Sequence, residues 1–181
     1  MRRRRELELR RRKARGKKLV IISVVIMAII GVSIYFAVSG GGGSSTQSNE
    51  SIKATWVTAW VVGDTVSIPV SEVENNKIIH FKLSTSASDI AFMAYELGGK
   101  MYVRSNVCPP CWSVGFSLQR DILVCDTCLT TFKAKTGDGI VGGCVDFPKA
   151  SVPYEITGGN IVMRGEDLLA AYQNTLNPGW P

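Results

Sequence analysis

Short segments in which apolar and polar residues alternate dominate the chain from residue 52 onward. Residues 64–70 and 77–83 show this alternation, which is typical of strands with one buried face. Within 77–83, Ile79 and Phe81 fall on one face and His80 on the other, so we expect His80 to face solvent. Further strands are predicted at 52–62, 90–97, 100–105, 116–118, 122–124, 152–156 and 161–163.

Turn signals join some of these strands. Gly98 and Gly99 separate 90–97 from 100–105, and glycine readily adopts the positive φ that a two-residue hairpin turn needs. Residues 167–176 predict one short helix that ends before Pro178. Strands and helices do not alternate, so we do not expect a parallel α/β sheet, and the predicted fold class is mainly β.

The N-terminal part has a different pattern. Residues 19–38 contain no charged side chain, and about 20 helical residues span a bilayer of about 30 Å. We therefore expect one transmembrane helix at 19–38. A cleavable signal peptide is the alternative, because small residues at Ala37 and Ser39 have the spacing of a cleavage site, but its apolar region would be shorter than this one.

Charge is concentrated before this apolar segment. Residues 1–18 hold eight Arg and three Lys against two Glu, whereas the rest of the chain carries a net charge of −3. The arginines predict a cytoplasmic tail and an extracytoplasmic domain. Because the folded part is mildly acidic, we expect no nucleic-acid binding. The expected organisation is a basic tail at 1–18, the membrane helix at 19–38, a Gly/Ser linker at 39–51, the β domain at 52–165, and a short helix with a tail at 166–181.

Two Cys-x-x-Cys turns carry the candidate chemistry. Cys108 and Cys111 form the first turn, Cys125 and Cys128 the second, and Cys144 follows two glycines. Two such turns can close a tetrahedral sulfur cage that suits zinc or an iron–sulfur cluster. Cys144 is an additional candidate ligand or a nearby free thiol.

Other interpretations of the five cysteines remain open. Structural zinc fits the spacing, and disulfides fit an oxidising exterior, although five cysteines leave one unpaired. A thioredoxin-like pair lacks its βαβ context. Trp112, directly after Cys111, is expected to shield the site from water.

The stretch from Cys125 to Gly137 resembles the second cluster-binding loop of Rieske iron–sulfur domains, which has a Cys, two residues, a His, and then a Phe and a Thr-Gly. Here Cys128 stands in place of that histidine. The resemblance implies a small Rieske-like β domain with two metal-binding hairpin loops.

A closer resemblance is to the membrane iron–sulfur FtrD-like family, from about Val66 to Pro148. It is carried by the ordered set Asn106-Val-Cys108-x-x-Cys111, Leu123-Val-Cys125-x-x-Cys128 and Gly142-Gly-Cys144. Proteins of that family are regarded as membrane-bound, ferredoxin-like electron carriers, some of them associated with iron uptake.

The resemblance implies an iron–sulfur cofactor, with zinc as the alternative, held by Cys108, Cys111, Cys125 and Cys128. We expect an electron carrier rather than a catalyst, anchored in the cell membrane and serving a redox partner protein or permease. A zinc-stabilised or disulfide-stapled binding module is the alternative function.

Overall fold

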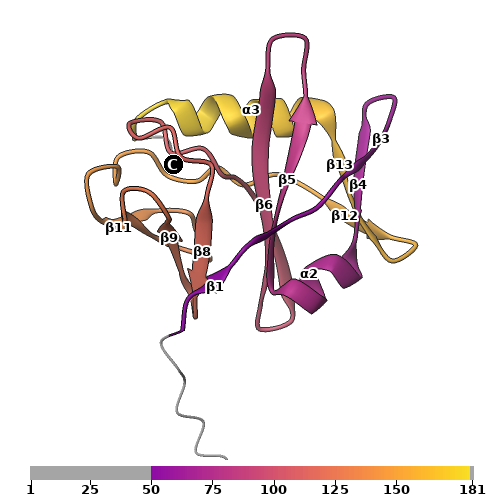
Figure 1. The fold of residues 1–181 in the computed structure, drawn as a ribbon. Helices are drawn as coiled ribbons and strands as arrows, with labels where there is room; N and C mark the ends of the chain where they lie inside the picture. Colours follow the sequence, from indigo (N-terminus) through magenta and orange to yellow (C-terminus); the bar gives the residue numbers. More distant parts are fainter. Residues whose placement is uncertain (1–49, 180–181) are drawn as a thin grey trace, which may run out of the picture. The chain divides into compact units, whose positions relative to one another are not determined.

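A computed structural model describes residues 50–179 of the chain (Figure 1). The expected basic tail, the membrane helix at 19–38 and nearly all of the linker lie outside the described residues. Within 50–179, neither helix has the length and apolar character needed to cross a bilayer.

The middle of the domain is a four-stranded sheet in the order β2-β5-β6-β7 (Figure 1). β5, β6 and β7 are antiparallel neighbours, and β6 and β7 meet at the predicted hairpin turn, where Gly98 and Gly99 have positive φ. The strands of this sheet are β2 (Thr55–Trp56), β5 (Ile78–Ser84), β6 (Asp89–Leu97) and β7 (Lys100–Ser105).

A second sheet, in the order β1-β8-β9-β10-β11, carries the cysteine turns. The first turn precedes β8, the second connects β9 to β10, and Cys144 follows β11. The strands of this sheet are β1 (Ile52–Lys53), β8 (Phe116–Gln119), β9 (Ile122–Cys125), β10 (Thr131–Lys133) and β11 (Gly139–Val141).

A third sheet, in the order β12-β13-β4-β3, lies on the other side of the middle sheet (Figure 1). One short helix lies beside it, and the C-terminal helix runs from this sheet across the top of Figure 1 toward the cysteine-bearing side. Leu168 and Ala171 of the second helix are buried in the core. The elements of this part are β3 (Trp60–Val62), β4 (Thr65–Pro69), α2 (Val70–Asn76), β12 (Glu155–Thr157), β13 (Asn160–Arg164) and α3 (Gly165–Leu176).

Each face of the middle sheet is covered by a hydrophobic core. Ile79 and Phe81 pack toward the third sheet, whereas Ile78 and Tyr95 pack in the cluster that includes Phe116 of the cysteine-bearing sheet. Alternate residues of β5 thus enter different cores. The sheet that carries the cysteine turns therefore packs against a middle sheet that is buried on both faces.

The mainly β prediction is confirmed, while several details differ. The segment 52–62 divides into β1, β2 and β3, which join three different sheets. The helix predicted at 167–176 begins two residues earlier, at Gly165. We did not predict α2, whose single buried side chain, Val73, gives it a weak amphipathic pattern. The short strands β10 and β11 were also missed.

Candidate metal centre

The two Cys-x-x-Cys turns have the same backbone closure. The Cys108 N–H donates to the carbonyl of Ser113, five residues on, and Cys125 donates likewise to Thr130, at 2.8 and 2.9 Å. The residue after each second cysteine, Trp112 or Leu129, donates its N–H back to the first cysteine's carbonyl, at 2.7 and 3.0 Å. These two residues have φ of 54° and 58°. The chain therefore builds one loop geometry twice.

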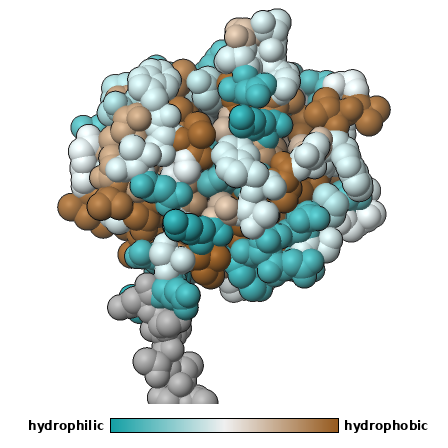
Figure 2. Space-filling view, viewed as in Figure 1, coloured by the Kyte–Doolittle hydropathy of each residue, from teal (hydrophilic) through white to brown (hydrophobic). Residues whose placement is uncertain are grey.

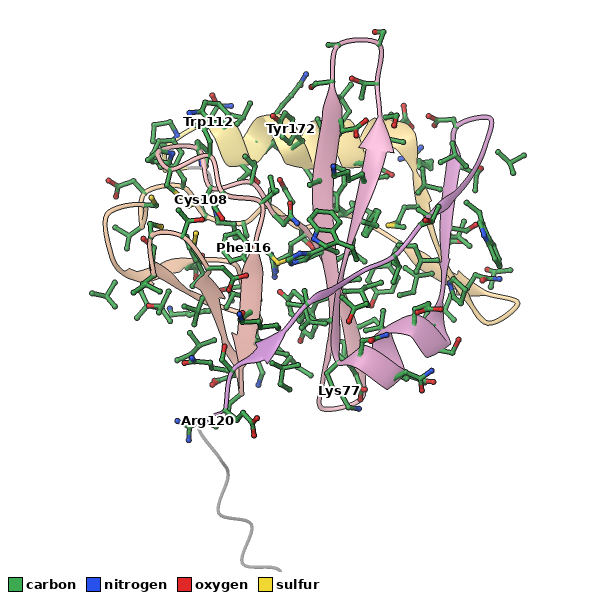
Figure 3. All side chains as sticks on the ribbon, in the orientation of Figure 1. Lys77, Cys108, Trp112, Phe116, Arg120 and Tyr172 are labelled. Carbon is green, nitrogen blue, oxygen red and sulfur yellow. The ribbon has the colours of Figure 1, made fainter. Side chains whose placement is uncertain are left out.

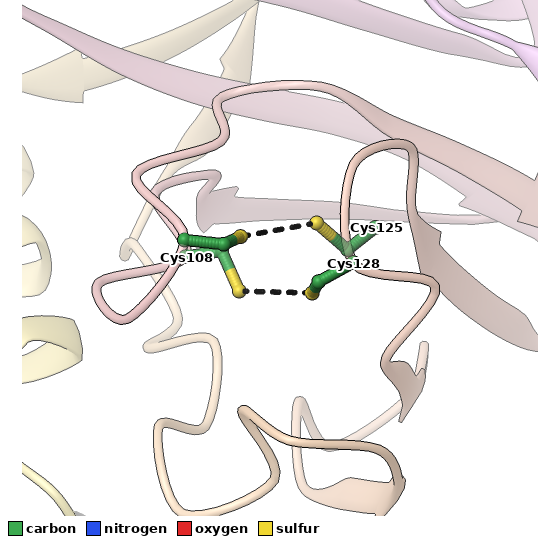
Figure 4. A group of neighbouring side chains, drawn as sticks. Cys108, Cys125 and Cys128 are labelled. Carbon is green, nitrogen blue, oxygen red and sulfur yellow. Dashed lines mark hydrogen bonds between the residues drawn. The ribbon is translucent and has the colours of Figure 1, made fainter.

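The two loops bring four sulfurs to one point. Cys108 Sγ lies 3.9 Å from Cys128 Sγ, and Cys111 Sγ lies 3.7 Å from Cys125 Sγ. All four sulfurs lie within 4.8 Å of one another. Figure 4 shows the sulfurs of the two loops facing one another. Among the described residues all five cysteines are free thiols.

The thiols differ in how readily they ionise. A hydrogen bond from Cys108 to Cys125 raises the pKa of Cys108 and lowers the pKa of Cys125 to about 4. Burial raises the pKa of Cys111 to about 11. Burial also opposes ionisation of Cys128, but hydrogen bonds from the hydroxyl and N–H of Thr130 hold its pKa below the usual value. Metal binding to this site must therefore release protons, chiefly from Cys108 and Cys111.

A buried cation lies beneath the cysteines. Lys149 is 1% exposed, and its ammonium donates to the carbonyl of Val107 at 2.8 Å. The ammonium also lies 4.5 Å from the ring centre of Phe132 and 5.5 Å from that of Phe116. Burial lowers the pKa of Lys149 to about 8, partly opposed by the charges of Cys108 and Cys125. A positive charge at this place offsets negative charge on the thiolates.

The fifth cysteine lies beside the cage. Cys144 Sγ is 3.6 Å from Cys128 Sγ, and the side chain is 3% exposed. The Cys144 N–H and the sulfur of Cys128 both contact the hydroxyl of Thr130, at 3.2 Å each. Cys144 is not part of the mutually close group of four sulfurs.

Two buried polar side chains anchor the loops. Asn106 donates to the carbonyls of Phe92 and Val114, which ties the first loop to β6. The guanidinium of Arg104, 4% exposed, donates to backbone carbonyls at Ala134, Lys135 and Lys149 and to the Tyr95 hydroxyl. Sequence reasoning missed the roles of Arg104 and Lys149, since Arg and Lys are almost never fully buried.

His80 was expected to face solvent, and that prediction is wrong. Its side chain is 2% exposed, and Trp56 packs against it edge-on at 5.0 Å between ring centres. Burial lowers the pKa of His80 to about 4, partly opposed by the charge of Asp126 and the backbone of Phe116. Alternation identified the two faces of β5 correctly, but the cysteine-bearing sheet covers the second face.

The rim of the site is apolar. Trp112 is 68% exposed, and Leu129 and Val141 are 70% and 65% exposed. That Trp112 shields the site from water stays a prediction. Figure 3 labels Trp112 at the outer edge of the first loop, beyond Cys108. In Figure 2, hydrophobic surface lies at the left edge, where Figure 1 places β11.

Four thiolates in a tetrahedral arrangement suit iron–sulfur centres as well as zinc. The four cysteines therefore fit iron. A mainly β domain with four converging cysteines belongs to the class of metal–thiolate proteins. The model of the family described as "Membrane iron-sulfur containing protein FtrD-like" matches residues 73–174, more than half of the chain. The chain belongs to this family, as the cysteine pattern predicted.

No curated protein matches the chain. Several solved structures resemble it. One, "Complex of reduced oxygenase and oxidized ferredoxin in carbazole 1,9a-dioxygenase", has 16% identity and a TM-score of 0.47, and the match covers 57% of this chain and 95% of that one. A ferredoxin of Sphingomonas yanoikuyae B1 has 19% identity, a TM-score of 0.38, and coverage of 46% and 83%. The ferredoxin of carbazole 1,9a-dioxygenase from Nocardioides aromaticivorans IC177 has 16% identity, a TM-score of 0.42, and coverage of 60% and 98%.

Proposed function

We propose that this protein transfers single electrons through iron held by Cys108, Cys111, Cys125 and Cys128. The observation that carries the proposal is the convergence of these sulfurs within 4.8 Å. The family match supports iron as the metal. Bound iron supplies the one-electron redox chemistry, while the protein orients the thiolates, buries Cys108 and Cys125, and supplies hydrogen bonds and the Lys149 cation.

We further propose that the domain works outside the cell, tethered to the membrane by residues 19–38. The charge-free segment and the arginine-rich residues 1–18 support this topology. A role in iron uptake or in another membrane redox system, beside a permease or redox protein, follows the family resemblance. Protease treatment of intact cells or spheroplasts tests the topology, since an outward domain is cleaved without lysis and an inward one is protected.

We propose that a partner protein binds at the rim of the cysteine site. We define the apolar rim as the exposed side chains around the cage, Trp112, Val114, Leu129, Ile140 and Val141. The segments that carry them, 108–117, 125–132 and 139–148, contain the carboxylates of Asp126 and Asp146 and no Lys or Arg. An apolar contact with acidic surroundings complements a partner protein that presents an apolar patch ringed by basic side chains.

Small redox probes test the charge of the rim. The chain should exchange electrons faster with the hexaammineruthenium cation than with ferricyanide, after correction for their potentials. Asp146→Asn should lower that preference about two- to five-fold, because it removes one negative charge near the site. Asp64→Asn, remote from the cysteine turns in the sequence, is the matched control. An unchanged preference in the Asp146 variant would contradict the assignment of the rim.

The central test is the metal itself. Full-length protein, purified anaerobically in detergent, is analysed for iron and zinc and titrated by visible and EPR spectroscopy. The proposal requires bound iron that is reduced and reoxidised by one electron without loss from the protein. Stoichiometric zinc in a colourless protein would establish the alternative, a zinc-stabilised binding module, which the same sulfur geometry accommodates.

A further inference from the structure

The spacing of the sulfurs points to the kind of iron centre. We propose that Cys108, Cys111, Cys125 and Cys128 hold one iron ion, without inorganic sulfide. This inference rests on the proposed function for the identity of the metal. It remains compatible with an iron–sulfur family, since the iron would be ligated by cysteine sulfur alone.

The distances between the cysteine sulfurs match those around a single tetrahedral ion. In a tetrahedral site with metal–sulfur bonds of about 2.3 Å, neighbouring sulfurs lie about 3.8 Å apart. The two distances between the loops, 3.7 and 3.9 Å, have this value. In a cluster with bridging sulfides, cysteine sulfurs on different irons are separated by both metal ions and lie more than about 5 Å apart. The limit of 4.8 Å on all four sulfurs leaves no pair of that length.

The loops resist widening. Cys108 and Cys125 are fully buried, and each donates its N–H across its own loop, to Ser113 and Thr130. Asn106 fixes the first loop to β6. Moving the first loop away from β6 to admit a larger cluster would break the hydrogen bonds of Asn106 and leave its buried amide without partners. The compact spacing is therefore built into the loops.

The fifth thiol is consistent with a single ion. Four sulfurs complete a tetrahedron, so Cys144 is left over, although its sulfur lies only 3.6 Å from that of Cys128. We infer that Cys144 stays a buried thiol beside the centre. A centre that recruited Cys144 would have to release one of the four cysteines that already lie close together.

Reconstitution distinguishes the two kinds of centre. Full-length apoprotein in detergent is treated anaerobically with ferrous iron alone, or with ferrous iron and sulfide, and then desalted and analysed for iron, acid-labile sulfide and protein. We expect one iron per chain and no sulfide in both arms. Two or more irons with matching sulfide in the second arm would overturn the single-ion inference and leave the electron-carrier proposal standing. Protein that binds no iron in either arm overturns both.

Spectroscopy gives an independent readout. A single oxidised ferric ion has an odd number of electrons and gives an EPR signal, whereas an oxidised two-iron cluster with paired spins gives none. The wild-type protein should show the signal when oxidised and lose it when reduced by one electron. An oxidised, iron-loaded protein without a signal would contradict the inference.

Cysteine variants complete the test. Cys144→Ser should keep one iron per chain, whereas Cys111→Ser and Cys128→Ser should lose at least about ten-fold in iron affinity, as expected when a ligand is removed. Far-UV circular dichroism establishes that each variant is folded. Loss of iron in a folded Cys144→Ser variant would show that Cys144 is a ligand and would overturn the assignment.

Discussion

Gly142 packs its α-carbon against Thr130, the residue whose hydroxyl contacts both Cys128 and the backbone of Cys144. A Cβ on Gly142 would stand 2.5 Å from the Thr130 hydroxyl oxygen, and φ at Gly142 is +127°. At Gly143 a Cβ would meet no atom within 4 Å, and φ there is not in the positive range that disfavours other residues. Gly142 therefore allows the segment that carries Cys144 to approach the cysteine cage.

We expect Gly142→Ala to weaken the site, because the clash displaces either Thr130 or Cys144. The free energy of unfolding should fall by about 2–4 kcal/mol, and iron should be lost more readily. Gly143→Ala is the matched control and should change stability by less than about 1 kcal/mol. Thermal unfolding and iron retention after desalting measure both effects. Equal losses in the two variants would refute this account of Gly142.

Lys149 should raise the reduction potential of the centre. Reduction adds negative charge to the thiolate site, and the buried ammonium stabilises it. Lys149→Met should therefore lower the potential by tens of millivolts or more, given the effective dielectric constant of about 20 in protein sites. Lys149→Arg retains the charge and serves as the control. A potential unchanged by the methionine variant would show that the charge of Lys149 does not act on the metal.

The chain's single histidine should titrate far below its usual range. Burial lowers the pKa of His80 from its usual 6.5 to about 4, so between these pH values the unfolded chain binds a proton that the folded chain does not. The contribution of neutral His80 to the free energy of unfolding is fully present above pH 6.5. It decreases as the pH falls toward 4, by up to about 3 kcal/mol.

NMR observation of this one imidazole tests the prediction directly, since no other histidine signal arises from the sequence. In parallel, the pH dependence of denaturant unfolding should become shallower between pH 6.5 and 4 in His80→Gln. A measured pKa near 6.5 would contradict the burial of His80.

Arg104 should be important for stability, although no acidic side chain within residues 50–179 pairs with it. Its guanidinium satisfies the carbonyls of Ala134, Lys135 and Lys149, all of them close to the cysteine-bearing sheet. Arg104→Lys keeps the charge but cannot reach every acceptor, so we expect a loss of about 3 kcal/mol or more in denaturant unfolding. The exposed Arg120→Lys should stay within about 0.5 kcal/mol. Similar values for both variants would rule out this role.

Local patterns predicted much of this fold. Alternation located β4 and β5, and the Gly98-Gly99 pair located the β6–β7 hairpin. The paired spacing of the cysteines predicted that the two turns would converge, and the structure brings the four sulfurs together. Their assignment as ligands of iron remains a prediction. These features depend on near neighbours in the sequence, which is why the sequence reveals them.

Features that depend on distant contacts were not predictable in this way. The burial of His80 depends on a sheet formed some 40 residues later, and the burial of Lys149 depends on the rings of Phe116 and Phe132. The division of residues 52–62 among three sheets depends on the partners β8, β5 and β4. The positive φ of Trp112 and Leu129 is likewise unexpected, because large side chains disfavour that region.

Glycine would suit the backbone at Trp112 and Leu129 better, since a left-handed conformation costs other residues about 1 kcal/mol. The chain nevertheless places an indole and an isobutyl group there, both mostly exposed. Engineering glycine into both positions should therefore make the domain more heat-resistant and, at the same time, a poorer electron-transfer partner. If the apolar rim binds a partner as proposed, the same two residues lower the thermal stability of the domain and contribute to that binding.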